Sequence, residues 1–117
     1  MTVAQTQIID WLGIESGTDH VSLTVVDDLD WSDEQQHLRL LEEKLNAYSA
    51  FIESGEVFER LAEDVGRPTP ASTPVKVSSL GKYDATSRAR AFLDHAVLTF
   101  MEAGFTLTHR VVKTQAE

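Results

Sequence analysis

The sequence predicts an α+β fold, a two-layer sandwich in which a mainly antiparallel sheet carries two helices on one face. Five short segments alternate polar and apolar residues, as half-buried strands do, and two longer segments repeat apolar residues every three or four positions, as amphipathic helices do. Their order along the chain is ββαββαβ. Since each helix has a single apolar face, both helices are expected on one side of the sheet. A length of 117 residues suits one domain, 1–117.

The first two strands are predicted to form a hairpin. Residues 8–14 read IIDWLGI, and residues 21–27 read VSLTVVD, in which Val21, Leu23 and Val25 alternate with polar neighbours. The intervening SGTD, 16–19, has the composition of a turn.

The first helix is predicted from Ser32 to Ser54. Ser32 and Gln35 fit a capping box, and Gly55 is placed to end the helix in a left-handed conformation. The apolar stripe consists of Leu38, Leu41, Leu45, Tyr48 and Ile52.

Residues 56–64, EVFERLAED, combine alternation at Val57 and Leu61 with residues that also form helices well. We expect a strand through about Leu61, because Gly55 marks a break and a returning strand would cover the hairpin. All three prolines fall within 66–74, which predicts a loop. Another strand is expected over 75–80.

The second helix is expected to begin after Asp84 or Thr86 and to end at Gly104. Residues 105–112, FTLTHRVV, then predict a closing strand in which His109 shares the register of the apolar residues. The apolar face of this helix consists of Ala89, Phe92, Leu93, Ala96, Val97, Phe100 and Met101.

Charge is unevenly distributed along the chain, whose net charge is −9. Residues 1–38 contain eight acidic residues and no Lys or Arg, residues 39–66 carry −4, and residues 67–117 carry +3. Nucleic acids and anionic membranes are disfavoured as partners, because their binding depends on Lys and Arg that neutralise phosphates. A protein with a basic surface would instead be attracted to the N-terminal third. The plainer reading is that acidity only maintains solubility.

Cysteine is absent, which excludes disulfides and thiolate chemistry and suits a reducing compartment. The chain has neither a basic leader nor an apolar run of membrane-spanning length. We therefore expect a cytoplasmic protein that is neither exported nor anchored.

The most acidic stretch, residues 27–37, reads DDLDWSDEQQH. It is not an EF-hand loop, because counting from Asp28 places Asp33 where glycine is needed and Arg39 where glutamate is needed. A carboxylate site for magnesium or calcium near Asp27, Asp28 and Asp30 stays open, as does a transition-metal pair of His37 and Asp33. The ordinary explanation is that Asp30, Asp33 and Glu34 stabilise the N-terminus of a helix.

Asp27 and Asp28 are not needed for such capping, and they flank a tryptophan that is either a core anchor or a recognition hot spot. We therefore predict a protein-binding surface here and expect no cofactor. The surface comprises Asp27, Asp28, Asp30, Trp31, Asp33 and Glu34.

Catalytic motifs such as GxSxG, HExxH, the P-loop and GxGxxG are absent from the sequence. A contact between His109 and a carboxylate would be either a proton-transfer pair or a satisfied core histidine. Mutual pKa shifts within the cluster from Asp27 to His37 would permit acid/base chemistry.

Four segments, IDWLGI, DDLDW, HLRLLEEKLNAY and FIESGE, resemble a family of small bacterial proteins of unknown function. Its signature is IDxxGI…DxLDW…EHLxxLQEKLNAYLxFIESGE. The match covers about residues 8–56, and AGFTLTHRV is similar to the family's last strand. The resemblance implies the order ββαββαβ and the strand after Gly55, and it implies no catalytic residue.

Three functions remain as hypotheses. The first is a non-enzymatic binding module of the immunity-protein type, which neutralises a cationic toxin. The second is a homo-oligomeric assembly module, such as a homodimer, that pairs through an edge strand near 57–61 or 105–112. The third is a metal-dependent or acid/base enzyme that uses the cluster from Asp27 to His37.

Overall fold

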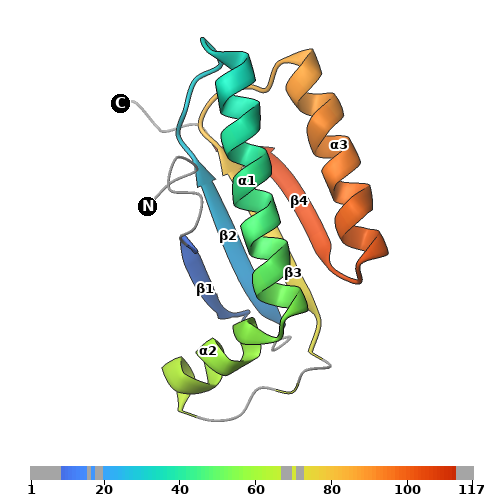
Figure 1. Ribbon diagram of the computed structural model, residues 1–117. Coiled ribbons are helices and arrows are strands. Elements are labelled where there is room, and N and C mark those ends of the chain that lie inside the picture. The colour runs from blue at the N-terminus through green and yellow to red at the C-terminus, as the bar shows by residue number, and fades with distance from the viewer. Residues whose placement is uncertain (1–8, 16, 18–19, 67–69, 71–72, 113–117) are drawn as a thin grey trace.

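The computed structural model describes residues 9–15, 17, 20–66, 70 and 73–112. Within these residues the order is ββααβαβ, which confirms an α+β fold but adds a helix and removes a strand (Figure 1). The elements are β1 (Trp11–Ile14), β2 (Val21–Asp27), α1 (Glu34–Glu53), α2 (Glu56–Val65), β3 (Val75–Gly81), α3 (Ser87–Glu102) and β4 (Thr106–Val111).

The sheet is mixed, and the prediction of a mainly antiparallel sheet is wrong. Its strand order is β1-β2-β3-β4, in which only β1 and β2 pair antiparallel, while β2 with β3 and β3 with β4 pair parallel. Parallel sheets are usually covered on both faces and then lack polar alternation. In the described part of the chain helices cover one face only, so the parallel strands β2 and β3 alternate buried and half-buried residues as antiparallel strands do.

Helices α1 and α3 lie on the same face of the sheet (Figure 1). Crossover connections between parallel strands are almost always right-handed, and the chain crosses the sheet in one direction from β2 to β3 to β4, so both helices fall on one side. The core between the two layers includes Leu23, Val25, Leu41, Val77 and Leu107.

The predicted hairpin is confirmed, because Trp11 pairs with Thr24 and Ile14 pairs with Val21. The first helix is confirmed as well, with small corrections at its start. Its N-cap is Asp33, whose side chain accepts a hydrogen bond from the backbone N–H of Gln36, so the predicted Ser32 capping box is not formed.

The predicted strand through Leu61 is wrong, since Glu56–Val65 forms α2. Val57 and Leu61 are fully buried four positions apart, a spacing that suits one helix face as well as alternation. Gly55 has φ 84° and therefore ends α1, as expected, but the chain turns directly into a second helix.

The second half follows the prediction more closely. Thr86 is the N-cap of α3, and Gly104, with φ 97°, follows the end of that helix. The proline loop 66–74 lies mostly outside the described residues. None of the helices in the described part of the chain is long and apolar enough to span a membrane.

Candidate functional site

A buried acid–histidine pair lies where β2 ends and α1 begins. Asp27 is the last residue of β2 and His37 lies in the first turns of α1, and the two side chains are 3% and 2% exposed. His37 Nε2 lies 2.7 Å from Asp27 Oδ1 and 2.6 Å from Asp27 Oδ2. The predicted docking residue Asp27 is therefore an internal group, which corrects the prediction that it faces a partner.

The hydrogen bonds of His37 define the proton content of this pair. Nδ1 lies 2.9 Å from the backbone carbonyl of Asp30, and since a carbonyl only accepts, Nδ1 carries a proton. The short contact between Nε2 and Asp27 then needs one more proton, on either the imidazole or the carboxyl. In both cases the pair is neutral as a unit, which makes its burial tolerable. Burial raises the pKa of the Asp27 carboxyl, and the hydrogen bond from His37 opposes that rise.

Trp31 covers the pair from the surface side. Its ring stacks on the His37 imidazole with centroids 3.5 Å apart and an interplanar angle of 18°. The tryptophan is half-buried, so it both packs against the core and keeps part of its indole exposed. Both ring nitrogens of His37 are hydrogen-bonded, and one face of its ring is covered by Trp31.

A second histidine lies close to the same strand ends. His109 Nδ1 on β4 lies 3.1 Å from the hydroxyl of the fully buried Ser79 on β3. A Cβ at position 81 would meet His109 Cε1 at 3.3 Å, so Gly81 leaves the space in which the ring lies. Burial lowers the pKa of His109, and the charge of Asp27 acts in the opposite direction. Burial of this half-buried side chain thus favours its neutral form.

The other predicted docking residues lie at the surface, except that Trp31 and Glu34 are only half-exposed. Asp30 accepts hydrogen bonds from the backbone N–H of Ser32 at 3.1 Å and from its hydroxyl at 2.6 Å, and these bonds lower the pKa of Asp30. Asp33 caps α1, and Glu34 lies 3.7 Å from Arg88. Within the described residues, Asp28, Asp30 and Asp33 form no salt bridge.

Metal binding gains no support from these positions. Among the residues that the structure describes, no group of three or more His, Asp or Glu side chains is arranged to hold an ion. The predicted pair of His37 and Asp33 is not formed, because His37 bonds Asp27 and Asp33 bonds a backbone N–H. Asp27, Asp28 and Asp30 do not converge either, since Asp27 points into the core while the other two are exposed.

A buried ion pair was missed by the sequence reasoning. Lys44 Nζ lies 2.8 Å from Asp10 Oδ1, and the two side chains are 0% and 1% exposed. Asp10 Oδ2 also accepts from the backbone N–H of Val26 at 2.8 Å, and the Tyr48 hydroxyl donates to the carbonyl of Thr24. The network ties the segment before β1 to β2 and α1. The signal was present, because Lys44 lies three residues after Leu41 on the buried stripe.

Comparison with known proteins places the chain in one family. A model described as a family of unknown function, DUF6572, matches residues 1–113. No curated protein and no solved structure matches the chain.

Proposed function

The chain belongs to this family of unknown function, DUF6572, and we propose that it is a non-enzymatic module that binds a protein with a basic surface. The binding surface is the exposed part of the predicted cluster, namely Asp28, Asp30, Trp31, Asp33 and Glu34, and is called here the α1 N-terminal surface. Asp27 is not part of it. The observation that carries the proposal is that Asp28, Asp30 and Asp33 are exposed together and form no salt bridge within the described residues.

Two of the charges of this surface, Asp30 and Asp33, are held in place by hydrogen bonds. Asp30 and Asp33 each accept backbone hydrogen bonds, which restrict their rotamers before any partner arrives. Trp31 is held by its stacking on His37 and keeps an exposed part beside them. Rigid aromatic groups flanked by charge lose little conformational entropy on binding, which is typical of recognition sites.

An immunity function is the most specific form of this proposal. In that form the partner is a cationic toxin whose positive surface is covered by the α1 N-terminal surface. Small size, strong acidity and the closed Asp27–His37 pair all suit a protein that acts by binding rather than by chemistry. The analogy concerns physical type only.

Affinity capture from the native cell tests the proposal. The bait variant Asp28→Asn with Asp33→Asn removes two charges but keeps an oxygen that can cap α1. The matched control is Asp94→Asn with Glu102→Gln, which removes two charges from exposed positions on α3. We expect a basic partner to be captured by the wild type and the control, and less so as salt rises. Association with the first variant should be roughly tenfold slower at low salt. Equal capture and equal rates for all three baits would refute the proposal.

Self-assembly through an edge strand is the second candidate. The predicted edge near 57–61 does not exist, because those residues are helical, but β4 is an outer strand of the sheet. Leu98 and Met101 on α3, the helix that leads into β4, are 57% and 59% exposed. A second copy that paired with β4 could cover both side chains. Light scattering tests this candidate, and a molecular mass that stays that of a monomer at millimolar concentration would refute self-assembly.

A further inference from the structure

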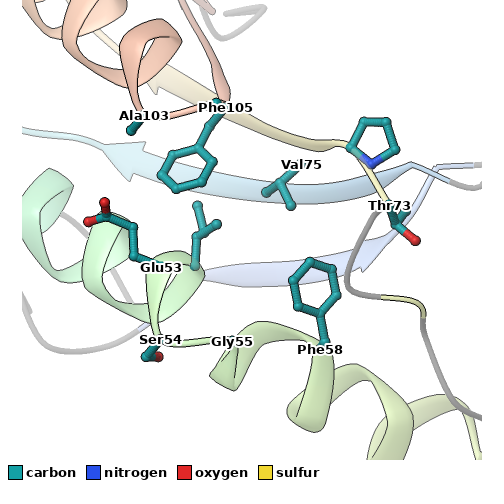
Figure 2. A pocket seen from close by; sticks show the side chains of 11 residues that line it. Glu53, Ser54, Gly55, Phe58, Thr73, Val75, Ala103 and Phe105 are labelled. Atoms are coloured by element: carbon teal, nitrogen blue, oxygen red, sulfur yellow. The ribbon is translucent and has the colours of Figure 1, made fainter.

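An open groove with a partly apolar lining lies at the opposite end of α1 from the α1 N-terminal surface. It has a volume of about 660 Å³ and is lined by the C-terminal end of α1, by α2, by Thr73 and Pro74 at the end of the proline loop, by the start of β3 and by the turn before β4. Figure 2 shows Phe58 and Phe105 reaching into it from opposite elements, with Val75 between them. Since α1 has 20 residues, about 30 Å separates the two regions.

The two aromatic rings are incompletely covered by the protein itself. Phe58 and Phe105 pack against the core but remain half-exposed, whereas Val75 beneath them is buried. Two glycines at the edge of the groove leave it open, because they have no side chains. A Cβ added to Gly55 or to Gly104 would have no atom within 4 Å, so the space beside each is empty of protein. The groove therefore has room for one large apolar side chain from outside.

One acidic side chain lines the groove, and further acidic side chains follow along α2. Glu53 lines the groove itself, and a second hollow, which shares Ser54 with the first, is lined by Glu56, Glu59 and Glu63 together with Arg60. The first turn of α2 carries Glu56 and Glu59, where they favour helix formation.

Other carboxylates here lie at helix C-termini. Glu53, the last residue of α1, accepts a hydrogen bond from the Ser49 hydroxyl at 3.1 Å. Glu63 and Asp64 lie in the last turn of α2. Negative charge at a helix C-terminus opposes the helix dipole, and neither last turn contains a basic residue to compensate. These charges act against the stability of the helices that carry them, which suggests that they serve a partner.

We propose that this groove binds an extended protein segment in which one large apolar side chain is flanked by Lys or Arg. The apolar side chain enters between Phe58 and Phe105, and the flanking cations meet Glu53 and the acidic side of α2. The protein's own proline loop does not fit this description, because 66–74 contains one arginine and no large apolar residue. The proposal does not depend on the α1 N-terminal surface.

Fluorescence anisotropy with a designed probe tests the groove. The probe is a fluorescein-labelled, end-blocked peptide, Gly-Ser-Lys-Lys-Phe-Lys-Lys-Ser-Gly, and two control peptides replace its Phe by Ser or its four Lys by Glu. We expect saturable binding of the probe, roughly tenfold weaker binding of the Ser peptide because an apolar anchor is lost, and no binding of the Glu peptide. Absence of saturable probe binding at millimolar protein would overturn the proposal.

Variants of the protein locate the binding. Ala103→Trp fills the groove from an exposed rim position, and Glu53→Gln with Glu59→Gln removes two charges beside it. Each should weaken probe binding at least about fivefold, a change of roughly 1 kcal/mol. Asp28→Asn with Asp33→Asn removes the same charge from the far end and should leave probe binding unchanged.

Amide NMR spectra of the wild type complete the test. Probe addition should shift the Gly55 and Gly104 signals and leave those of residues 28–34 in place. Shifts confined to residues 28–34, or equal binding by the groove variants and the wild type, would overturn the proposal. A concentration-dependent mass that Ala103→Trp abolishes would overturn it too, since a second copy would then be the occupant.

Discussion

Replacing His37 by phenylalanine should destabilise the protein far more than replacing Asp27 by asparagine. Phenylalanine preserves the ring that stacks on Trp31 but cannot bond the Asp27 carboxyl, which would then be buried with only the backbone N–H of Leu29 as a partner. Asparagine can donate its amide N–H to Nε2 of a neutral His37, whose Nδ1–H continues to donate to the Asp30 carbonyl. The amide oxygen of the asparagine also remains an acceptor for the backbone N–H of Leu29.

The expected magnitudes follow from the burial of the pair. Removing one partner of a buried charged pair costs about 3–5 kcal/mol, while a substitution that keeps the hydrogen bonds costs about 1 kcal/mol or less. A domain of this length loses roughly 0.25 kcal/mol of unfolding free energy per degree near its melting temperature. His37→Phe should therefore lower the melting temperature by about 12–20 °C, and Asp27→Asn by about 4 °C or less.

Thermal unfolding followed by circular dichroism at pH 7 and at pH 5 measures both effects. A carboxyl without its partner can bind a proton, so the deficit of His37→Phe should shrink at pH 5. The double variant, Asp27→Asn with His37→Phe, should be more stable than His37→Phe alone, because it no longer buries the Asp27 carboxylate without its histidine. Equal, small losses for the two single variants at pH 7 would show that the pair is not buried as described.

Three further predictions use the same assay. Lys44→Met leaves Asp10 buried without its cation and should cost about 3–5 kcal/mol; a loss below about 1 kcal/mol would contradict the buried ion pair. Thr86→Ala removes the side-chain oxygen that accepts from the Ala89 N–H and should lower the free energy of unfolding by about 1 kcal/mol. An unchanged stability would show that this cap does not stabilise α3. Burial lowers the pKa of His109, so the unfolded chain binds its proton first as pH falls below about 6.5. The stability of the wild type should therefore fall more between pH 7 and pH 5 than that of His109→Asn. Parallel curves of stability against pH for the two proteins would show that protonation of His109 does not contribute to this loss.

Local patterns predicted the elements whose burial follows a single period. The hairpin, α1, α3 and the closing strand were all visible from spacing and end signals. The direction of strand pairing was not visible, because alternation shows only that one face of a strand is more exposed to solvent than the other. Strand 75–81 illustrates this limit: Val75 and Val77 face the core in either a parallel or an antiparallel sheet. Residues 56–64 failed for a related reason, because the positions of Val57 and Leu61 satisfy both periods.

The candidate site was predictable as a location but not as a set of roles. Sequence alone identified residues 27–37 as unusual and named His37 and the neighbouring carboxylates. It did not separate Asp27 from Asp28, although one is buried and the other exposed. Continuing the alternation of Val21, Leu23 and Val25 by two residues places Asp27 on the buried face and would have separated them. The partner of Lys44 was hidden from the sequence, since Asp10 lies 34 residues away and is brought near only by the hairpin.

Helix capping and partner recognition do not compete for the acidic residues that remain outside. A carboxylate that accepts hydrogen bonds from N–H or O–H groups is held in its charged form, as the lowered pKa of Asp30 indicates. Such bonds use some lone pairs of the carboxylate and leave others facing solvent. Asp33 therefore stabilises α1 and, in the proposed function, presents negative charge to the partner with the same side chain. Asp28 has no such local duty, so its contribution to binding can be measured without a loss of stability, which makes Asp28→Asn the cleanest single probe of the α1 N-terminal surface.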